Sequence, residues 1–77
     1  MSAGDDLKNE FQTRYPQLTT IAKKYLGWAD EYTIRKASSG DVPFNIFKVV
    51  DSNKSPWLVD VYDFGDYLEK RRGMRHG

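Results

Sequence analysis

The segment Trp57–Phe64 is rich in strand-forming residues and constrains the fold more than any other part of the sequence. Trp57, Val59 and Val61 would share one face of a strand, whereas Tyr62 would lie on the other face. The residues that follow are basic and have helical spacing. The pattern therefore predicts a strand with one buried and one half-exposed face, leading into a short C-terminal helix.

The first part of the chain has the spacing of helices. Apolar residues recur every three or four positions, beginning with Leu7 and Phe11, and charged residues occupy the remaining positions. Pro16 interrupts this pattern, because proline lacks an N–H group and restricts the residue before it. Gly27 is suited to end a helix. We therefore expect two short helices, or one kinked helix, with a break near Tyr15–Pro16.

The second half of the chain predicts a sheet. Three segments alternate apolar and polar residues or are rich in strand-forming residues, and turn-forming residues separate them. The three predicted strands are 31–37, 44–50 and 57–62. Short links between successive strands favour antiparallel pairing. The expected fold class is α+β, with an N-terminal helix or helix pair, a three-stranded antiparallel β-meander and a short C-terminal helix, in the order αβββα.

The length of 77 residues predicts a single domain spanning 1–77, with residues 1–5 and 74–77 disordered. Such a small chain has a limited core, and the absence of cysteine excludes disulfide bonds. The two Trp, five Tyr and four Phe residues can supply the missing apolar area. An aromatic-rich core is the expected result.

Several function classes find no support in the sequence. A cysteine nucleophile is excluded, and the one histidine, His76, lies in the C-terminal tail. Asp60, Asp63 and Asp66 recur every three residues, but solvent exposure and helix capping explain them better than metal binding. We expect no enzymatic activity, catalytic residue, metal or cofactor. Without an export signal or an apolar span, a cytoplasmic protein without membrane contacts is expected.

The leading functional hypothesis is a small regulatory or inhibitor-type protein that binds a protein partner. The net charge of +1 is too small to predict nucleic-acid binding by itself, and the domain has more aromatic residues than its core needs. Trp, Tyr and Arg are enriched at interface hot spots. The predicted partner-binding residues are Trp57, Tyr62, Tyr67, Arg71 and Arg72, and a monomer is expected rather than an oligomer.

The alternative hypothesis is a regulator that binds DNA or RNA through its basic C-terminal helix. Basic residues cluster there, at spacings that allow contact with consecutive phosphates: Lys70, Arg71, Arg72 and Arg75. The same residues would also complement the helix dipole without binding anything. A third possibility is self-association through an unpaired edge of the sheet.

Overall fold

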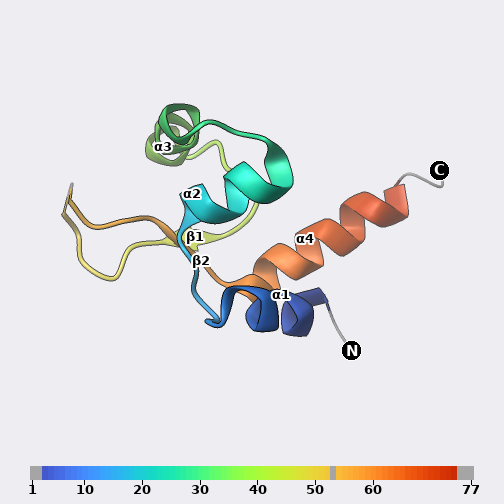
Figure 1. The fold of residues 1–77 in the computed structure, drawn as a ribbon. Helices are drawn as coiled ribbons and strands as arrows, with labels where there is room; N and C mark the ends of the chain where they lie inside the picture. Colours follow the sequence, from blue (N-terminus) through green and yellow to red (C-terminus); the bar gives the residue numbers. More distant parts are fainter. Residues whose placement is uncertain (1–2, 53, 75–77) are drawn as a thin grey trace.

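The structure is a computed structural model that describes residues 3–52 and 54–74 (Figure 1). Helices dominate it, and the sheet is small. The helices are α1 (Ala3–Phe11), α2 (Leu18–Ile21), the π-helical turn η1 (Ala22–Leu26), α3 (Asp30–Ser39) and α4 (Val61–Met74), and the strands are β1 (Ile46–Phe47) and β2 (Leu58–Val59). The predicted α+β class is confirmed, but the three-stranded meander is not.

The break in the N-terminal helices falls where the sequence predicts it. α1 ends at Phe11 and α2 begins at Leu18, so Pro16 lies in the extended link between them. Gly27 ends η1 with a φ of 70°, a left-handed conformation that glycine adopts at little cost. Local backbone chemistry therefore sets both of these boundaries.

The predicted first strand, residues 31–37, is wrong because this segment forms α3. Thr33 and Ala37 are one helical turn apart, and both are buried against the rest of the protein. Gly40 ends the helix with a φ of 73°, so this glycine is a helix cap and not the turn of a β-hairpin. Helical packing overrides the strand propensity of Tyr32 and Ile34.

The remaining strands are shorter than predicted. The expected strand 44–50 is reduced to β1, and the expected strand 57–62 is reduced to β2. The two pair antiparallel, with Ile46 opposite Val59. On the other edge of β2, the backbone N–H of Val59 donates to the carbonyl of Pro16 at 3.0 Å. The extended link before α2 thus takes the place of the missing strand.

Helix α4 begins earlier than expected because Asp60 stops the strand. The backbone N–H of Tyr62 donates to Asp60 Oδ1 at 2.9 Å, which satisfies a donor in the first turn. Asp60, and not Asp63, therefore caps this helix. The helix continues to Met74.

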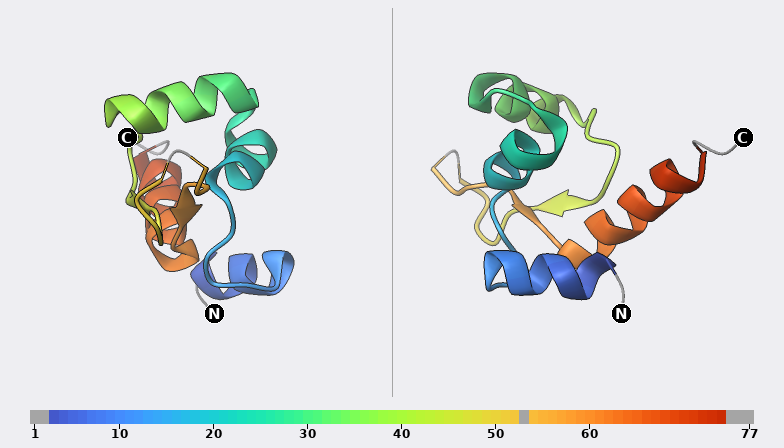
Figure 2. Two further views of the ribbon diagram at one scale, coloured as in Figure 1. Left: turned by 90° about the vertical axis from the view of Figure 1, so that its left-hand side faces the viewer. Right: turned by 45° about the vertical axis from the view of Figure 1, so that its right-hand side comes forward.

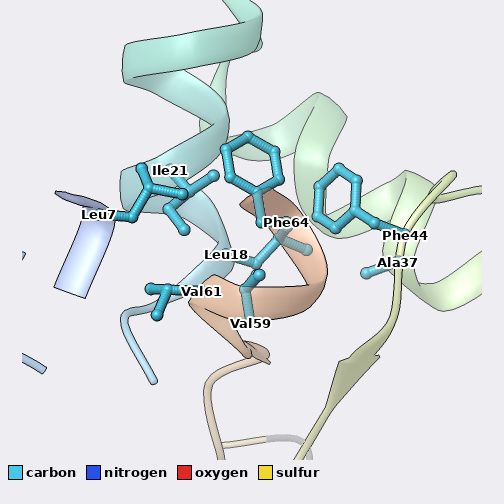
Figure 3. Packing of buried hydrophobic residues seen from close by; sticks show 8 residues of the cluster. All are labelled: Leu7, Leu18, Ile21, Ala37, Phe44, Val59, Val61 and Phe64. Atoms are coloured by element: carbon cyan, nitrogen blue, oxygen red, sulfur yellow. The ribbon is translucent and has the colours of Figure 1, made fainter. Parts of the chain in front are cut away.

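The core lies where α4, α2 and α3 meet the small sheet (Figure 3). Phe64 is fully buried and packs its ring against Phe44, at a centroid distance of 4.8 Å. The expected aromatic contribution to the core is therefore present. The buried cluster consists of Leu7, Leu18, Ile21, Ala37, Phe44, Val59, Val61 and Phe64.

Two glycines allow α1 and α4 to pack closely. A Cβ atom added to Gly65 would lie 2.7 Å from the backbone nitrogen of Gly4, and one added to Gly4 would collide with the side chain of Tyr62. Gly65 therefore marks a close helix crossing inside α4. The N-terminal segment expected to be disordered includes residues 3–5, which lie in α1. Met74 likewise ends α4, while residues 1–2 and 75–77 are outside the described ranges.

The described elements leave two ends of the molecule clearly separated. α3 and the loop between β1 and β2 lie on one side, and the C-terminal end of α4 extends away on the other (Figures 1 and 2). Any surface built from α3 is therefore distinct from one built from the end of α4.

Candidate nucleic-acid interface

Two helical segments joined by a tight turn form the most distinctive local arrangement. α2 and η1 together span residues 18–26, Gly27 turns the chain, and Ala29 is the N-cap of α3. α3 then runs across the preceding helix (Figure 2). Two helices joined by a turn of about three residues that contains glycine have the connectivity of a helix-turn-helix unit.

One face of α3 holds it against the protein. Thr33 and Ala37 are buried, and the hydroxyl of Thr33 donates to the carbonyl of Ala29 at 2.9 Å. Helical geometry places Glu31 and Arg35 on the opposite face, where both are exposed. Arg35 forms no ion pair with any residue in the described ranges. This side chain is therefore available to an external ligand.

An aromatic cluster flanks the exposed face of α3. The rings of Trp28 and Tyr32 meet edge to face, with centroids 5.3 Å apart. Lys36 Nζ lies 5.8 Å from the Trp28 ring centroid and 5.6 Å from that of Tyr32, within range of cation–π attraction. The two rings therefore restrain the charged end of Lys36, the residue that follows Arg35. An open depression of about 340 Å³ lies there, lined by Tyr32, Arg35, Lys36, Ser39 and Asp41.

The loop between β1 and β2 presents a second basic surface. Lys48 Nζ donates to the carbonyl of Ser52 at 3.1 Å and lies 4.8 Å from the centroid of the Trp57 ring. These contacts hold the base of the loop together. Lys54 is exposed, and Val49 is 75% exposed beside Lys48. The loop therefore projects small apolar and basic side chains into solvent.

The basic residues near α2 and η1 are less available. Lys23 pairs with Asp30 at 3.5 Å, and Lys24 pairs with Glu10. The pKa of Glu10 is lowered by its hydrogen bond with Lys24 and by that with Tyr25. Burial and the Glu10 carboxylate raise the pKa of Tyr25 to about 12. The Lys24–Glu10 pair joins η1 to α1, and the Lys23–Asp30 pair joins η1 to α3.

The structure places the predicted aromatic contact residues in intramolecular contacts. Trp57 is half-buried under Lys48. The Tyr62 hydroxyl donates to Asp5 Oδ1 at 2.8 Å, and its pKa is raised mainly by that bond. Tyr67 packs on Phe44, at a centroid distance of 5.2 Å. All three keep some exposed surface, and their role in partner binding stays a prediction.

The predicted basic residues of α4 are exposed near its C-terminal end. Lys70, Arg71 and Arg72 are on the surface, far from α3 (Figure 1). Arg75, the fourth residue of the predicted nucleic-acid surface, is outside the described residues. The structure therefore does not bring the predicted C-terminal cluster together with the aromatic residues Trp57 and Tyr62 into one site.

The exposed face of α3 and the β1–β2 loop are not among the surfaces that the sequence predicts. Two signals for α3 were present: Gly27 three residues before the acidic start of the helix, and Gly40 at its end. Together they frame a helix of the observed length. Among the residues that the structure describes, no cluster of three or more metal-ligating side chains occurs, and no helix has the length and apolar character needed to cross a bilayer.

Comparison with known proteins identifies one family. The model of that family, described as pyocin activator protein PrtN, matches residues 5–74 and thus nearly the whole chain. Its description denotes a regulator rather than an enzyme, in agreement with the expected non-enzymatic regulatory role. No curated protein and no solved structure gives a significant match.

Proposed function

We propose that this chain regulates transcription by binding duplex DNA through α3 and the β1–β2 loop. The chain belongs to the family of the pyocin activator protein PrtN, and this membership supports a regulatory role. The observation that carries the proposal is the helix-turn-helix connectivity of residues 18–39, in which Arg35 stands exposed on the second helix. In such units the second helix enters the major groove.

The outer face of α3 has the chemistry needed to read base edges. An α-helix with its side chains is about 10–12 Å across and fits the major groove, which is about 12 Å wide. Arg35 would donate two hydrogen bonds to a guanine, and the carboxylate of Glu31 would accept one from the amino group of a cytosine. We therefore propose that these two side chains select a site that contains G·C pairs.

The neighbouring cations are suited to phosphate contacts. Lys36 is held by its aromatic neighbours beside the open depression, and Ser39 adds a hydroxyl there. Lys48 and Lys54, on the β1–β2 loop, would contact DNA phosphates. Phosphate contacts fix the position of a protein on DNA but carry no sequence information directly.

The small net charge limits non-specific affinity. With about three lysine–phosphate contacts, the logarithm of the binding constant should fall with the logarithm of the salt concentration with a slope of about −2.7. Glu31 and Asp30 at the start of α3 repel phosphates and further disfavour random sequences. Binding should therefore depend strongly on base contacts.

The test begins with selection of duplexes from a random-sequence library by the wild-type protein, followed by titration in fluorescence anisotropy. Arg35→Ala should weaken binding to the selected duplex roughly 10- to 100-fold and relax its sequence preference. Lys54→Ala should weaken binding to all sequences about equally and reduce the salt slope by about 1. Arg72→Ala, a substitution at the far end of α4, serves as the matched control.

Other outcomes discriminate between the hypotheses. If Arg72→Ala and Arg71→Ala abolish binding whereas Arg35→Ala does not, the C-terminal helix is the nucleic-acid surface. If no duplex is enriched and none binds at low salt, the DNA-binding proposal is wrong, and a regulator that acts on a protein partner is favoured.

A further inference from the structure

One face of α4 carries opposite charges at its two ends. Helical spacing groups these side chains on one stripe, away from the core residues Val61 and Phe64. Acidic residues come first, a tyrosine follows, and a lysine ends the pattern. The stripe consists of Asp63, Asp66, Tyr67 and Lys70, and it lines an open depression of about 250 Å³ together with Pro43, Phe44 and Asn45.

The stripe is only partly used within the chain. Asn45 Nδ2 donates a long hydrogen bond of 3.5 Å to Asp63 Oδ2. Tyr67 stacks on Phe64 with a centroid distance of 6.0 Å but stays partly exposed. Asp66 and Lys70 are exposed and form no ion pair with another residue in 3–52 or 54–74.

The C-terminal part of α4 extends beyond the body of the protein (Figure 2). The close crossing with α1 is near Gly65, in the first half of the helix. An isolated helix of fewer than about 12–15 residues is marginally stable in water, so a helix that projects in this way gains from an additional packing partner.

We propose that the stripe Asp63–Asp66–Tyr67–Lys70 binds the same stripe of a second copy of this chain, with the two α4 helices antiparallel about a two-fold axis. With the axis between Asp66 and Tyr67, Asp63 faces the partner's Lys70 and Asp66 faces the partner's Tyr67. A two-fold interface uses one patch on both subunits, and a stripe with acid at one end and base at the other is complementary to itself when reversed.

The antiparallel arrangement of the two α4 helices determines how strongly the dimer associates and whether α3 stays accessible in it. Two single helix faces bury less than the roughly 1,600 Å² of a standard interface, so association without DNA should be weak. The proposed dimer differs from the monomer expected from the sequence. The C-terminal part of α4 extends away from α3, so pairing through α4 should leave both copies of α3 accessible (Figure 1).

The test is sedimentation equilibrium of the full chain at low salt, from micromolar to near-millimolar concentration and without DNA. The wild type should show a reversible rise in average mass towards twice the monomer. Asp63→Lys and Lys70→Asp should each weaken the dimer roughly 5- to 30-fold, because each places like charges opposite each other at two symmetric positions. The double variant Asp63→Lys/Lys70→Asp should restore association.

The controls separate this interface from folding and from DNA binding. Glu69→Lys changes the charge on a different face of α4 and should leave the dimer unchanged, and circular dichroism melts should show that each variant is folded. A wild type that stays monomeric throughout, or a double variant no stronger than the single ones, would overturn the proposal. Because the measurement contains no DNA, either result leaves the proposed function of α3 to its own test.

Discussion

The two ends of the molecule use similar residue types for different purposes. Where α1 meets the start of α4, polar side chains are paired within the chain: Tyr62 with Asp5, and Arg14 with Asp60 at 3.2 Å. At the α3 end, Arg35 has no described ion-pair partner. Side chains that already have partners can stabilise the fold, whereas exposed cations without them are free to bind. The paired groups are suited to stabilising the contact between α1 and α4, and the exposed Arg35 is suited to the DNA contact proposed above.

The largest expected effect on stability comes from adding a side chain where α1 and α4 cross closely. In Gly65→Ala, the new methyl group collides with the backbone of Gly4, which cannot rotate away as a side chain can. Overpacking of this kind costs about 1–3 kcal/mol. Thermal and urea unfolding should show the loss, whereas DNA affinity at a temperature where the variant is folded should be unchanged.

The matched control is Glu69→Ala, at an exposed position on the same helix. It should change the free energy of unfolding by less than about 0.5 kcal/mol. If Gly65→Ala instead weakens DNA binding without lowering stability, the two ends are not separate in function.

A smaller effect is expected at the start of α4. Asp60→Ala removes the acceptor of the Tyr62 N–H and the partner of Arg14, and the loss of a helix cap costs about 0.5–2 kcal/mol. Asp60→Asn keeps an acceptor at the cap but removes the charge. Chemical denaturation should therefore show the asparagine variant to be nearly as stable as the wild type. An equal loss in both variants would assign the stability to the ion pair.

The smallest effect concerns pH and the contact between α1 and η1. The hydrogen bonds with Lys24 and Tyr25 lower the pKa of Glu10 in the folded state. The ionised Glu10 carboxylate therefore stabilises the fold above its unfolded pKa of 4.5, and this stabilisation is lost as the pH falls through the folded pKa. Glu10→Gln should therefore remove part of the pH dependence of the melting temperature below about pH 4.5. Identical pH profiles for the two proteins would show that this contact does not contribute.

Local backbone chemistry explains which parts of the fold were predictable. Pro16 acts through its missing N–H group, and Gly27 acts through its left-handed φ angle. The sequence therefore predicts both the break before α2 and the end of η1. The segment 31–37 was mistaken for a strand because Tyr32 and Ile34 satisfy a period of two, while the burial of Thr33 and Ala37 that fixes the helix depends on tertiary packing.

The candidate site was harder to predict for the same reason. Basic residues in α4 are adjacent in sequence and easily noticed, whereas the cations proposed to bind DNA are distributed over α3 and the loop. Arg35 was assigned to a strand, so its exposed position on a helix after a tight turn was not foreseen. Lys48 and Lys54 share one loop because β1 and β2 pair, and this pairing depends on tertiary structure.

In the proposed complex, α3 and the β1–β2 loop bind DNA, and the end of α4 does not. The most direct test is a titration of the ¹⁵N-labelled full chain with a selected duplex, followed by two-dimensional NMR. Amide shifts should concentrate at Glu31–Ser39 and around Lys48 and should be small at Arg71 and Arg72. Shifts confined to Lys70–Arg72, with α3 unchanged, would contradict it.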